Sequence, residues 1–541
     1  MSVREQIESI FPEEEEIPER VLAGIPIHQD RFLVNGEVRR WSGPMQEVYS
    51  PVCVTTSKEA FPKRVGSYPL LTEKEAVDAL DGAVQAYDHG RGLWPTMPVG
   101  ERIAHIEDFT HRMIEKRDDV VNLLMWEVGK SCQDSEKEFD RTVQYIGDTI
   151  GALKDLDRLS SRFVIEQGIM GQIRRAPLGV ALCMGPFNYP LNETFATLIP
   201  ALIMGNSVII KPPKHGALLY GCLLEAFRDA FSKGVVNTVY GKGREVLPPL
   251  MSSGKIDVLA FIGTSRGANQ LKKQHPRLHR LRSALGMEAK NAGIILPDAD
   301  MDLAVRECVL GCLSFNGQRC TALKILFVHS RILDSFLESF SEAIGRLTCG
   351  MPWEEKVFIT PLPEPKKPDY LTGLVEDAVH FGAKVVNKDG GCVNQTFFYP
   401  ALLFPVNDAM KVYHEEQFGP VIPVIAFDDI ETPIQYVIGS NYGQQLSIFG
   451  TDPGAIARLI DPLVNQVCRV NINSQCQRGP DTFPFTGRKD SAEGTLSVAD
   501  ALRVFSIRTL VAAKEAEINK EIMTRIVRDR ASKFLSTDFI L

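Results

Sequence analysis

The chain has 541 residues and a mass of 60.1 kDa, which exceeds one ordinary domain and leads us to expect at least two large lobes. A formal net charge of −8 and a pI near 5.8 leave no basic surplus, which argues against nucleic acid as the main ligand. The 11 cysteines include no CxxC pair, so neither a zinc site nor a disulfide framework is expected.

The N-terminal third of the chain divides into an arm and a helical layer. Residues 1 to about 70 are rich in proline and charge and predict an irregular arm. The acidic start MSVREQIESIFPEEEEIPER is typical of neither a secretory signal nor a transit peptide, so a cytoplasmic protein is expected. Helical periodicity runs from Thr72 to Leu156. No apolar stretch reaches the ~20 residues that span a bilayer, and we expect no membrane partner.

From Gly179 onward, short apolar runs alternate with amphipathic helical segments. The first set is GVALCMG, NSVIIKPP, VVNTVYG and VLAFIG, with helices from Asn192, over ALLYGCLLEAFRDAF and from Glu245. The second set is NAGIILP, TALKILFVHS, VIPVIAF, QQLSIFG and QVCRVNIN, with helices over 302–315 and ILDSFLESFSEAIGRL. Apolar strands separated by helices are typical of a parallel sheet covered on both faces. The fold class predicted is α/β, with two doubly wound lobes.

Two further segments predict an oligomerisation extension. SRFVIEQGIMGQIRRAPL alternates like a β-hairpin, and with the late strand LRVFSIRTLVAA it predicts a shared sheet between subunits. The expected divisions are an arm and helices (1–158), a bridging hairpin (159–177), a cofactor-binding lobe (178–290), a catalytic lobe (291–487), a return strand (488–514) and a C-terminal helical extension (515–541).

Three segments carry candidate chemistry. Cys320 follows a glycine-containing break in SFNGQRCT, beside an arginine whose charge favours a thiolate nucleophile, although a lone cysteine is more often structural. Asn188 follows the first apolar strand in GPFNYP, where ligands bind open α/β sheets, and offers a side-chain N–H to an oxyanion. Glu415 and Glu416 precede Phe418 in EEQFGP, which taken alone is a charged loop.

Together, PFNYP, IIKPP, GQRC and EEQFGPV resemble the aldehyde dehydrogenase superfamily, in order, from about residue 30 to residue 514. Within it, GQRCTALK, VFITPL and INSQCQRGPDTFPF are most similar to the non-phosphorylating, NADP-dependent glyceraldehyde-3-phosphate dehydrogenases. The resemblance implies a homodimer or homotetramer that acts on a small phosphorylated aldehyde. It also implies phosphate-binding roles for Arg141, Tyr189, Arg319 and Arg478, since guanidinium groups bind phosphate in a fork.

The resemblance also implies the cofactor contacts. Lys211 is expected near the adenosine ribose, and Lys214 stands where members that prefer NAD usually have a glutamate, so NADP is favoured and NAD is possible. The remaining implied contacts are Gly241, Gly263 and Thr264 at the pyrophosphate, Glu416 at the nicotinamide ribose and Phe418 near the ring.

One departure concerns release of the thioester that Cys320 would form. The family's general base opens a Glu-Leu-Gly-Gly-Lys segment, but here the chain reads Gly286-Met-Glu288-Ala-Lys, with glycine at the base position. Three alternatives follow: Glu288 acts as a displaced base from the same face of an extended backbone; CoA replaces water, as in acylating semialdehyde dehydrogenases; or the protein is a weak or retired enzyme.

Overall fold

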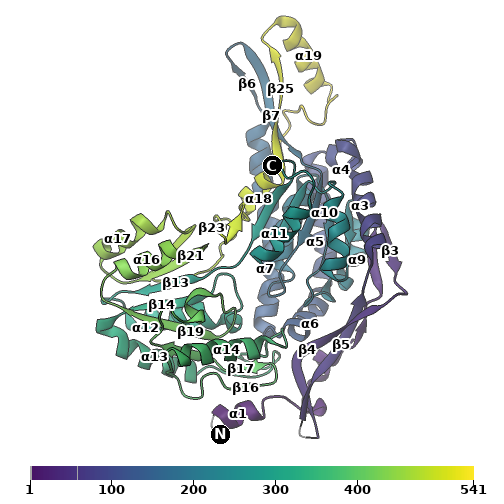
Figure 1. Ribbon diagram of the computed structural model, residues 1–541. Coiled ribbons are helices and arrows are strands. Elements are labelled where there is room, and N and C mark those ends of the chain that lie inside the picture. Colours follow the sequence, from purple (N-terminus) through teal and green to yellow (C-terminus); the bar gives the residue numbers. More distant parts are fainter. Residues whose placement is uncertain (1–2, 58, 541) are drawn as a thin grey trace.

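The computed structural model describes residues 3–57 and 59–540 and confirms the α/β fold class (Figure 1). A six-stranded sheet has the order β10-β9-β8-β11-β12-β24. Its parallel strands are β8 (Val180–Met184), β9 (Ser207–Ile210), β10 (Val236–Thr238), β11 (Val258–Ile262) and β12 (Arg282–Gly286), and β24 (Ala492–Glu493) closes one edge antiparallel. Residues in β8 and β9 are all buried, as the continuous apolar runs predict.

Helices cover both faces of this sheet. The connections α8 (Asn192–Ile203), α9 (Leu219–Ala230), α10 (Gly243–Ser252) and α11 (Ser265–Gln274) are the helices expected between the strands. The predicted helical layer is also present, as α3 (Glu73–Tyr87), α5 (Val99–Ile114), α6 (Arg117–Val128) and α7 (Cys132–Ser160). Thr72 and Glu75 form a capping box at the start of α3, which explains why this helix begins there.

The second lobe contains a seven-stranded sheet with the order β15-β18-β19-β14-β13-β21-β22. Its strands are β13 (Asn291–Ile295), β14 (Leu323–His329), β15 (Lys384–Val385), β18 (Ala401–Phe404), β19 (Val421–Phe427), β21 (Gln445–Phe449) and β22 (Arg469–Ile472), flanked by α12 (Met301–Leu313), α13 (Leu333–Gly345), α14 (Lys367–His380), α16 (Glu431–Gly439) and α17 (Pro453–Leu463). All neighbouring pairs except β15-β18 are parallel, so their carboxyl ends meet at one edge.

The N-terminal arm is more regular than its composition predicts. Residues expected to be irregular form β4 (Met45–Thr56) and β5 (Glu59–Pro69), which pair antiparallel. Pro51 lies where this pairing is interrupted between Tyr49 and Cys53, so it removes no hydrogen bond from the ladder. An irregularity in the hairpin therefore accommodates Pro51, whereas Pro62 and Pro69 stand opposite Cys53 and Met45 in the paired segments.

A projecting arm carries the predicted hairpin and the return strand (Figure 1). β6 (Phe163–Glu166), β7 (Ile169–Pro177) and β25 (Ser506–Lys514) form one antiparallel sheet. The C-terminal helix α19 (Glu517–Arg528) covers one face of it, where Met523 and Leu535 pack with Met170. Within the described residues, the helices are too short or too polar to cross a membrane.

Candidate active site

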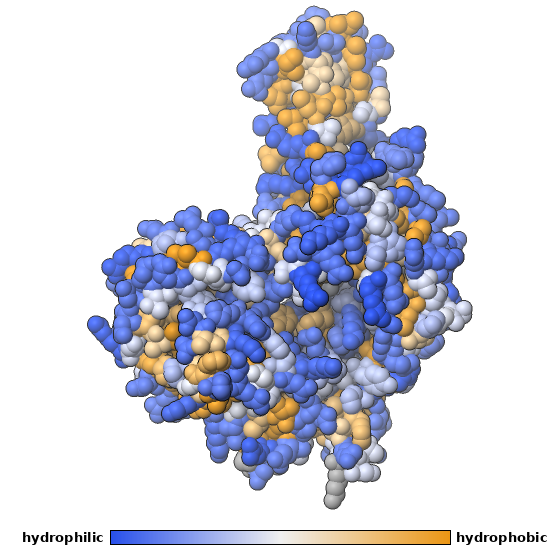
Figure 2. All heavy atoms as spheres, in the orientation of Figure 1, coloured by the Kyte–Doolittle hydropathy of each residue, from blue (hydrophilic) through white to orange (hydrophobic). Residues whose placement is uncertain are grey.

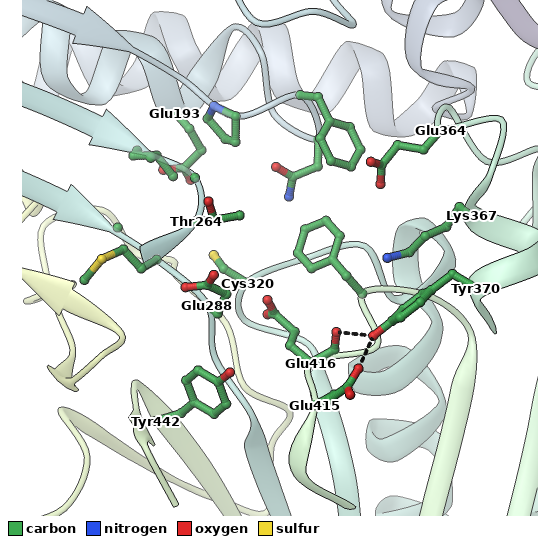
Figure 3. Close-up of a pocket in the computed structure, with 18 residues that line it drawn as sticks. Glu193, Thr264, Glu288, Cys320, Glu364, Lys367, Tyr370, Glu415, Glu416 and Tyr442 are labelled. Carbon is green, nitrogen blue, oxygen red and sulfur yellow. Dashed lines mark hydrogen bonds between the residues drawn. The ribbon is translucent and has the colours of Figure 1, made fainter. Parts of the chain in front are cut away.

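A cavity of about 570 Å³ opens where the carboxyl ends of β8, β11 and β12 in one sheet face the amino ends of β14, β19 and β21 in the other. The segments after β8, β11 and β12 line it from one lobe, and the segments around Cys320 and Glu416 line it from the other (Figure 3). Many residues predicted from the sequence share its wall, namely Asn188, Gly263, Thr264, Gly286, Glu288, Cys320, Glu416 and Phe418.

Cys320 lies in the loop between α12 and β14. Phe315, Asn316 and Gly317 all have positive φ angles, of 48°, 55° and 70°, and turn the chain sharply ahead of the cysteine. Behind the cysteine, its carbonyl oxygen accepts hydrogen bonds from Asn291 Nδ2 at 2.8 Å and Lys324 Nζ at 3.0 Å. The backbone of Cys320 is thereby fixed, while the side chain faces the cavity.

The charge environment of Cys320 differs from the expectation that an adjacent arginine favours the thiolate. Burial, followed by the negative charge of Glu193, raises the pKa of the Cys320 thiol above its usual value. Arg319 instead donates to the carbonyl oxygens of Leu310 and Gly311, at 3.0 and 3.1 Å. This guanidinium nitrogen is thus directed to the last turn of α12, and Arg319 is not among the main causes of the shift at the thiol.

Asn188 is held against the segment that carries Cys320. Its Nδ2 donates to the carbonyl oxygen of Gln318 at 2.8 Å, and its own carbonyl oxygen accepts from Lys130 Nζ at 2.7 Å. A side-chain amide has two N–H groups, so one remains for a ligand in the cavity.

Lys130 belongs to a buried ion pair that sequence reasoning missed. Lys130 and Glu138 have 0% exposed side chains and contact each other directly. Glu138 Oε1 accepts the backbone N–H groups of Leu191 at 3.0 Å and Asn192 at 3.1 Å. The pair therefore joins α7 to the loop that presents Asn188 and to the start of α8.

Glu288 lies beyond the strand rather than on it. β12 ends at Gly286, two residues before Glu288. The Glu288 carboxylate accepts the backbone N–H of Ser265 at 2.8 Å and caps α11. A Cβ at Gly286 would meet its nearest neighbour, Ile262, at 3.4 Å, so ordinary packing does not demand glycine there.

Two of the three predicted phosphate-binding arginines meet at one carboxylate. Arg141 donates to Asp481 through Nε and Nη2 at 2.8 and 2.7 Å, and Arg478 Nε lies 3.0 Å from the same group. Arg478 is also paired with Glu193. The ring of Tyr189 lies 3.6 Å from Lys130 Nζ. No sequence pattern indicated that carboxylates neutralise these arginines, although Asp481 follows Arg478 in QRGPD and Glu193 is an isolated acid in the apolar stretch NETFATLIPALI.

The predicted cofactor residues fall into two groups. Gly263, Thr264, Glu416 and Phe418 line the cavity, where Glu416 is paired with Lys324 and accepts the Ala289 N–H at 3.1 Å. Lys211, Lys214 and Gly241 lie outside the lining, beyond the ends of β9 and β10. Gly241 has a φ of 113°, and a Cβ there would approach the Leu71 backbone to 3.0 Å, so packing explains this glycine.

Comparisons with known proteins match nearly the whole chain. The sequence model described as "Aldehyde dehydrogenase family" matches residues 53–510. The NADP-dependent glyceraldehyde-3-phosphate dehydrogenase of Streptococcus equinus is 32% identical over 87% of this chain and 95% of that protein. The malonate-semialdehyde dehydrogenase of Bacillus cytotoxicus is 26% identical over 82% of this chain and 91% of that protein.

Solved structures agree with these sequence matches. The crystal structure of the NADP-dependent glyceraldehyde-3-phosphate dehydrogenase from Bacillus halodurans, complexed with NADP, has a TM-score of 0.81 and 30% identity. The match covers 90% of this chain and 99% of that chain.

Proposed function

The chain belongs to the aldehyde dehydrogenase family, and from this premise we propose that it oxidises a phosphorylated aldehyde, best represented by glyceraldehyde 3-phosphate, to the acid with NADP. The observation that carries the proposal is the placement of Cys320 and Asn188 in one cavity between the two large sheets. The activity and cofactor for which the relatives are named support the choice of aldehyde and of NADP.

In the proposed reaction, Cys320 Sγ attacks the aldehyde carbon. The free N–H of Asn188 and the backbone N–H of Cys320 donate to the oxygen, which gains negative charge. When bound, NADP accepts the hydride, leaving a thioester on Cys320. Water is proposed to hydrolyse that thioester to the acid, because the chain is similar to the NADP-dependent glyceraldehyde-3-phosphate dehydrogenases.

The residues after β9 fit a dinucleotide with an extra phosphate. The Lys211 Nζ donates to the Pro212 carbonyl oxygen at 2.8 Å, and burial lowers its pKa to about 8. This leaves donors for a ribose hydroxyl. Lys214 is exposed and carries its charge at the same end of the strand, where it would attract a 2′-phosphate. At the other end of the site, Thr264 caps α11, and Glu416 and Phe418 are proposed beside the nicotinamide.

Lys214→Glu is expected to reverse the cofactor preference. The variant loses a cation, and its new carboxylate repels the 2′-phosphate of NADP and can accept a hydrogen bond from the 2′-hydroxyl of NAD. The kcat/KM for NADP should therefore fall about 10-fold or more, and the kcat/KM for NAD should rise. The measurement is kcat/KM for both cofactors at fixed aldehyde. Lys242→Glu, an exposed lysine of the next strand's loop, serves as a matched control. An unchanged ratio in Lys214→Glu would remove Lys214 from the proposed cofactor site.

The proposed substrate is tested by comparing glyceraldehyde 3-phosphate with glyceraldehyde. If Arg141, Tyr189, Arg319 and Arg478 bind the phosphate, kcat/KM for the phosphorylated aldehyde should be about 100-fold higher, which corresponds to one or two charge-assisted hydrogen bonds. Equal values would contradict the proposed substrate class. A burst of NADPH without turnover, relieved by CoA, would contradict hydrolysis.

We also infer that the projecting sheet of β6, β7 and β25 mediates a homodimer or homotetramer. The face of its sheet opposite α19 exposes Val164 and Leu510, which are 46% and 57% accessible. Figure 2 shows apolar side chains gathered on this arm. Such a surface on a projecting sheet is typical of a contact between subunits.

A further inference from the structure

Hydrolysis of the proposed thioester needs a group that takes a proton from water, and Gly286 cannot supply it. Glu288 is engaged elsewhere, because its Oε2 accepts the Ser265 N–H at 2.8 Å and its Oε1 lies 3.4 Å from Ser265 Oγ. Both oxygens are thus directed to the first residue of α11. In this arrangement Glu288 serves as a helix cap, and the base has to be sought among the other acids of the cavity.

Glu193 is a carboxylate of the same cavity that the proposed mechanism has not used. It stands at the second position of α8, five residues after Asn188, and lines the wall together with Cys320 (Figure 3). The side chain is 7% exposed and is paired with Arg478, itself 4% exposed. A buried ion pair of this kind keeps the carboxylate at a fixed place beside the nucleophile.

Only one oxygen of Glu193 is occupied. Arg478 Nη1 donates to Oε2, whereas no donor among residues 3–57 and 59–540 is hydrogen-bonded to Oε1. Oε1 is not one of the fully buried side-chain atoms that lack a hydrogen-bond partner. Because it has no partner, it must keep some accessible surface, and we place this surface at the cavity that Glu193 lines. This oxygen is free to accept a hydrogen bond from a water molecule in the cavity that Cys320 also lines.

The electrostatics of the nucleophile agree with this placement. After burial, Glu193 is the leading cause that raises the pKa of the Cys320 thiol, ahead of the opposing charges of Lys324 and Arg478. Glu288 does not belong to the leading causes of that shift. The charge of Glu193 therefore acts on the thiol from within the same cavity, in agreement with its place on the cavity wall.

We propose that Glu193 is the general base that deacylates Cys320, an inference that rests on the proposed thioester chemistry. A water oxygen bonds to the thioester carbon while one water proton passes to Glu193 Oε1. The C–S bond then breaks, its electron pair leaves on the Cys320 sulfur, and the carboxylic acid is released. Glu193 afterwards returns its proton to solvent, so that the step consumes one water and needs no other reactant.

Glu193→Gln separates this role from a merely structural one. The amide keeps the size of the side chain and an acceptor for Arg478 but cannot take a proton. We expect the rapid burst of NADPH to be retained at one equivalent per active site, which reports folding, cofactor binding and acylation, followed by a steady-state rate about 100-fold below that of the wild type. Hydroxylamine, which attacks thioesters without a base, should restore turnover. Glu364→Gln, at another acid of the cavity wall, is the matched control and should keep its steady-state rate.

The same variants are also assayed with p-nitrophenyl acetate, which acylates the cysteine without aldehyde or NADP. If glyceraldehyde 3-phosphate gives no burst with the wild type, the proposed substrate is wrong. The deacylation rate measured with the ester still tests the role of Glu193 in that case. The inference is overturned if Glu193→Gln deacylates at the wild-type rate. It is equally overturned if Glu288→Gln loses deacylation while Glu193→Gln keeps it. In Glu193→Asp, a partial rate with a retained pH dependence is expected, because a carboxylate remains.

Discussion

Cys320→Ser is expected to abolish aldehyde oxidation, lowering steady-state NADPH formation by at least about 1000-fold. A serine hydroxyl is a weak nucleophile unless a base removes its proton, whereas a thiol retains a reactive thiolate fraction even when its pKa is raised. The substitution changes one atom, and the hydrogen bonds that fix this loop use the carbonyl oxygen of residue 320, which is kept. The measurement is NADPH absorbance in both burst and steady state.

The matched control for this variant is Cys132→Ser. Cys132 is partly buried like Cys320, but it lies at the start of α7 and does not line the cavity. It should retain wild-type rates. Oxidation of aldehyde by Cys320→Ser at more than a few per cent of the wild-type rate would contradict covalent catalysis by this cysteine and return Cys320 to a structural role.

Much of the architecture could be predicted from periodicity. Runs such as GVALCMG and NSVIIKPP are apolar throughout because both faces of β8 and β9 are covered, and this distinguishes them from half-exposed strands. The sequence also placed Asn188 after the carboxyl end of a strand, where open α/β sheets bind ligands, and Asn188 does line the cavity. Cys320 reaches the same cavity from the amino end of β14, which no sequence pattern indicated. The β4-β5 hairpin could not be predicted, because its prolines indicate a loop until the interruption in pairing is known.

The partners of the charged residues were beyond sequence reasoning. Arg478 and Glu193 are separated by 285 positions, and no local pattern shows that one neutralises the other. Ahead of Arg319, Phe315 and Asn316 have positive φ angles, which an aromatic residue seldom adopts, and no sequence pattern indicated this turn. Likewise, nothing in the sequence showed that Arg319 Nη2 donates to carbonyl oxygens in the last turn of α12.

Lys130→Met is expected to lower the free energy of unfolding by ~3–5 kcal/mol, because it leaves the Glu138 carboxylate buried without its cation. The variant also removes the donor to the Asn188 carbonyl oxygen, so the loop that presents the oxyanion amide loses its anchor. We therefore expect a lower midpoint of urea unfolding at an unchanged m value, together with a reduced kcat in the folded protein.

Arg117→Met provides the comparison. Arg117 at the start of α6 pairs with Asp140 of α7, but this pair is open to solvent, with side chains 32% and 58% accessible. Solvent screens that pair, and its loss should cost less than ~1 kcal/mol. Equal destabilisation by the two variants would contradict the importance assigned to burial.

In the double variant Lys130→Met/Glu138→Met, no unpaired charge remains, yet the free energy of unfolding should recover only in part. Glu138 also accepts the N–H groups of Leu191 and Asn192, and methionine leaves both without a partner at the start of α8.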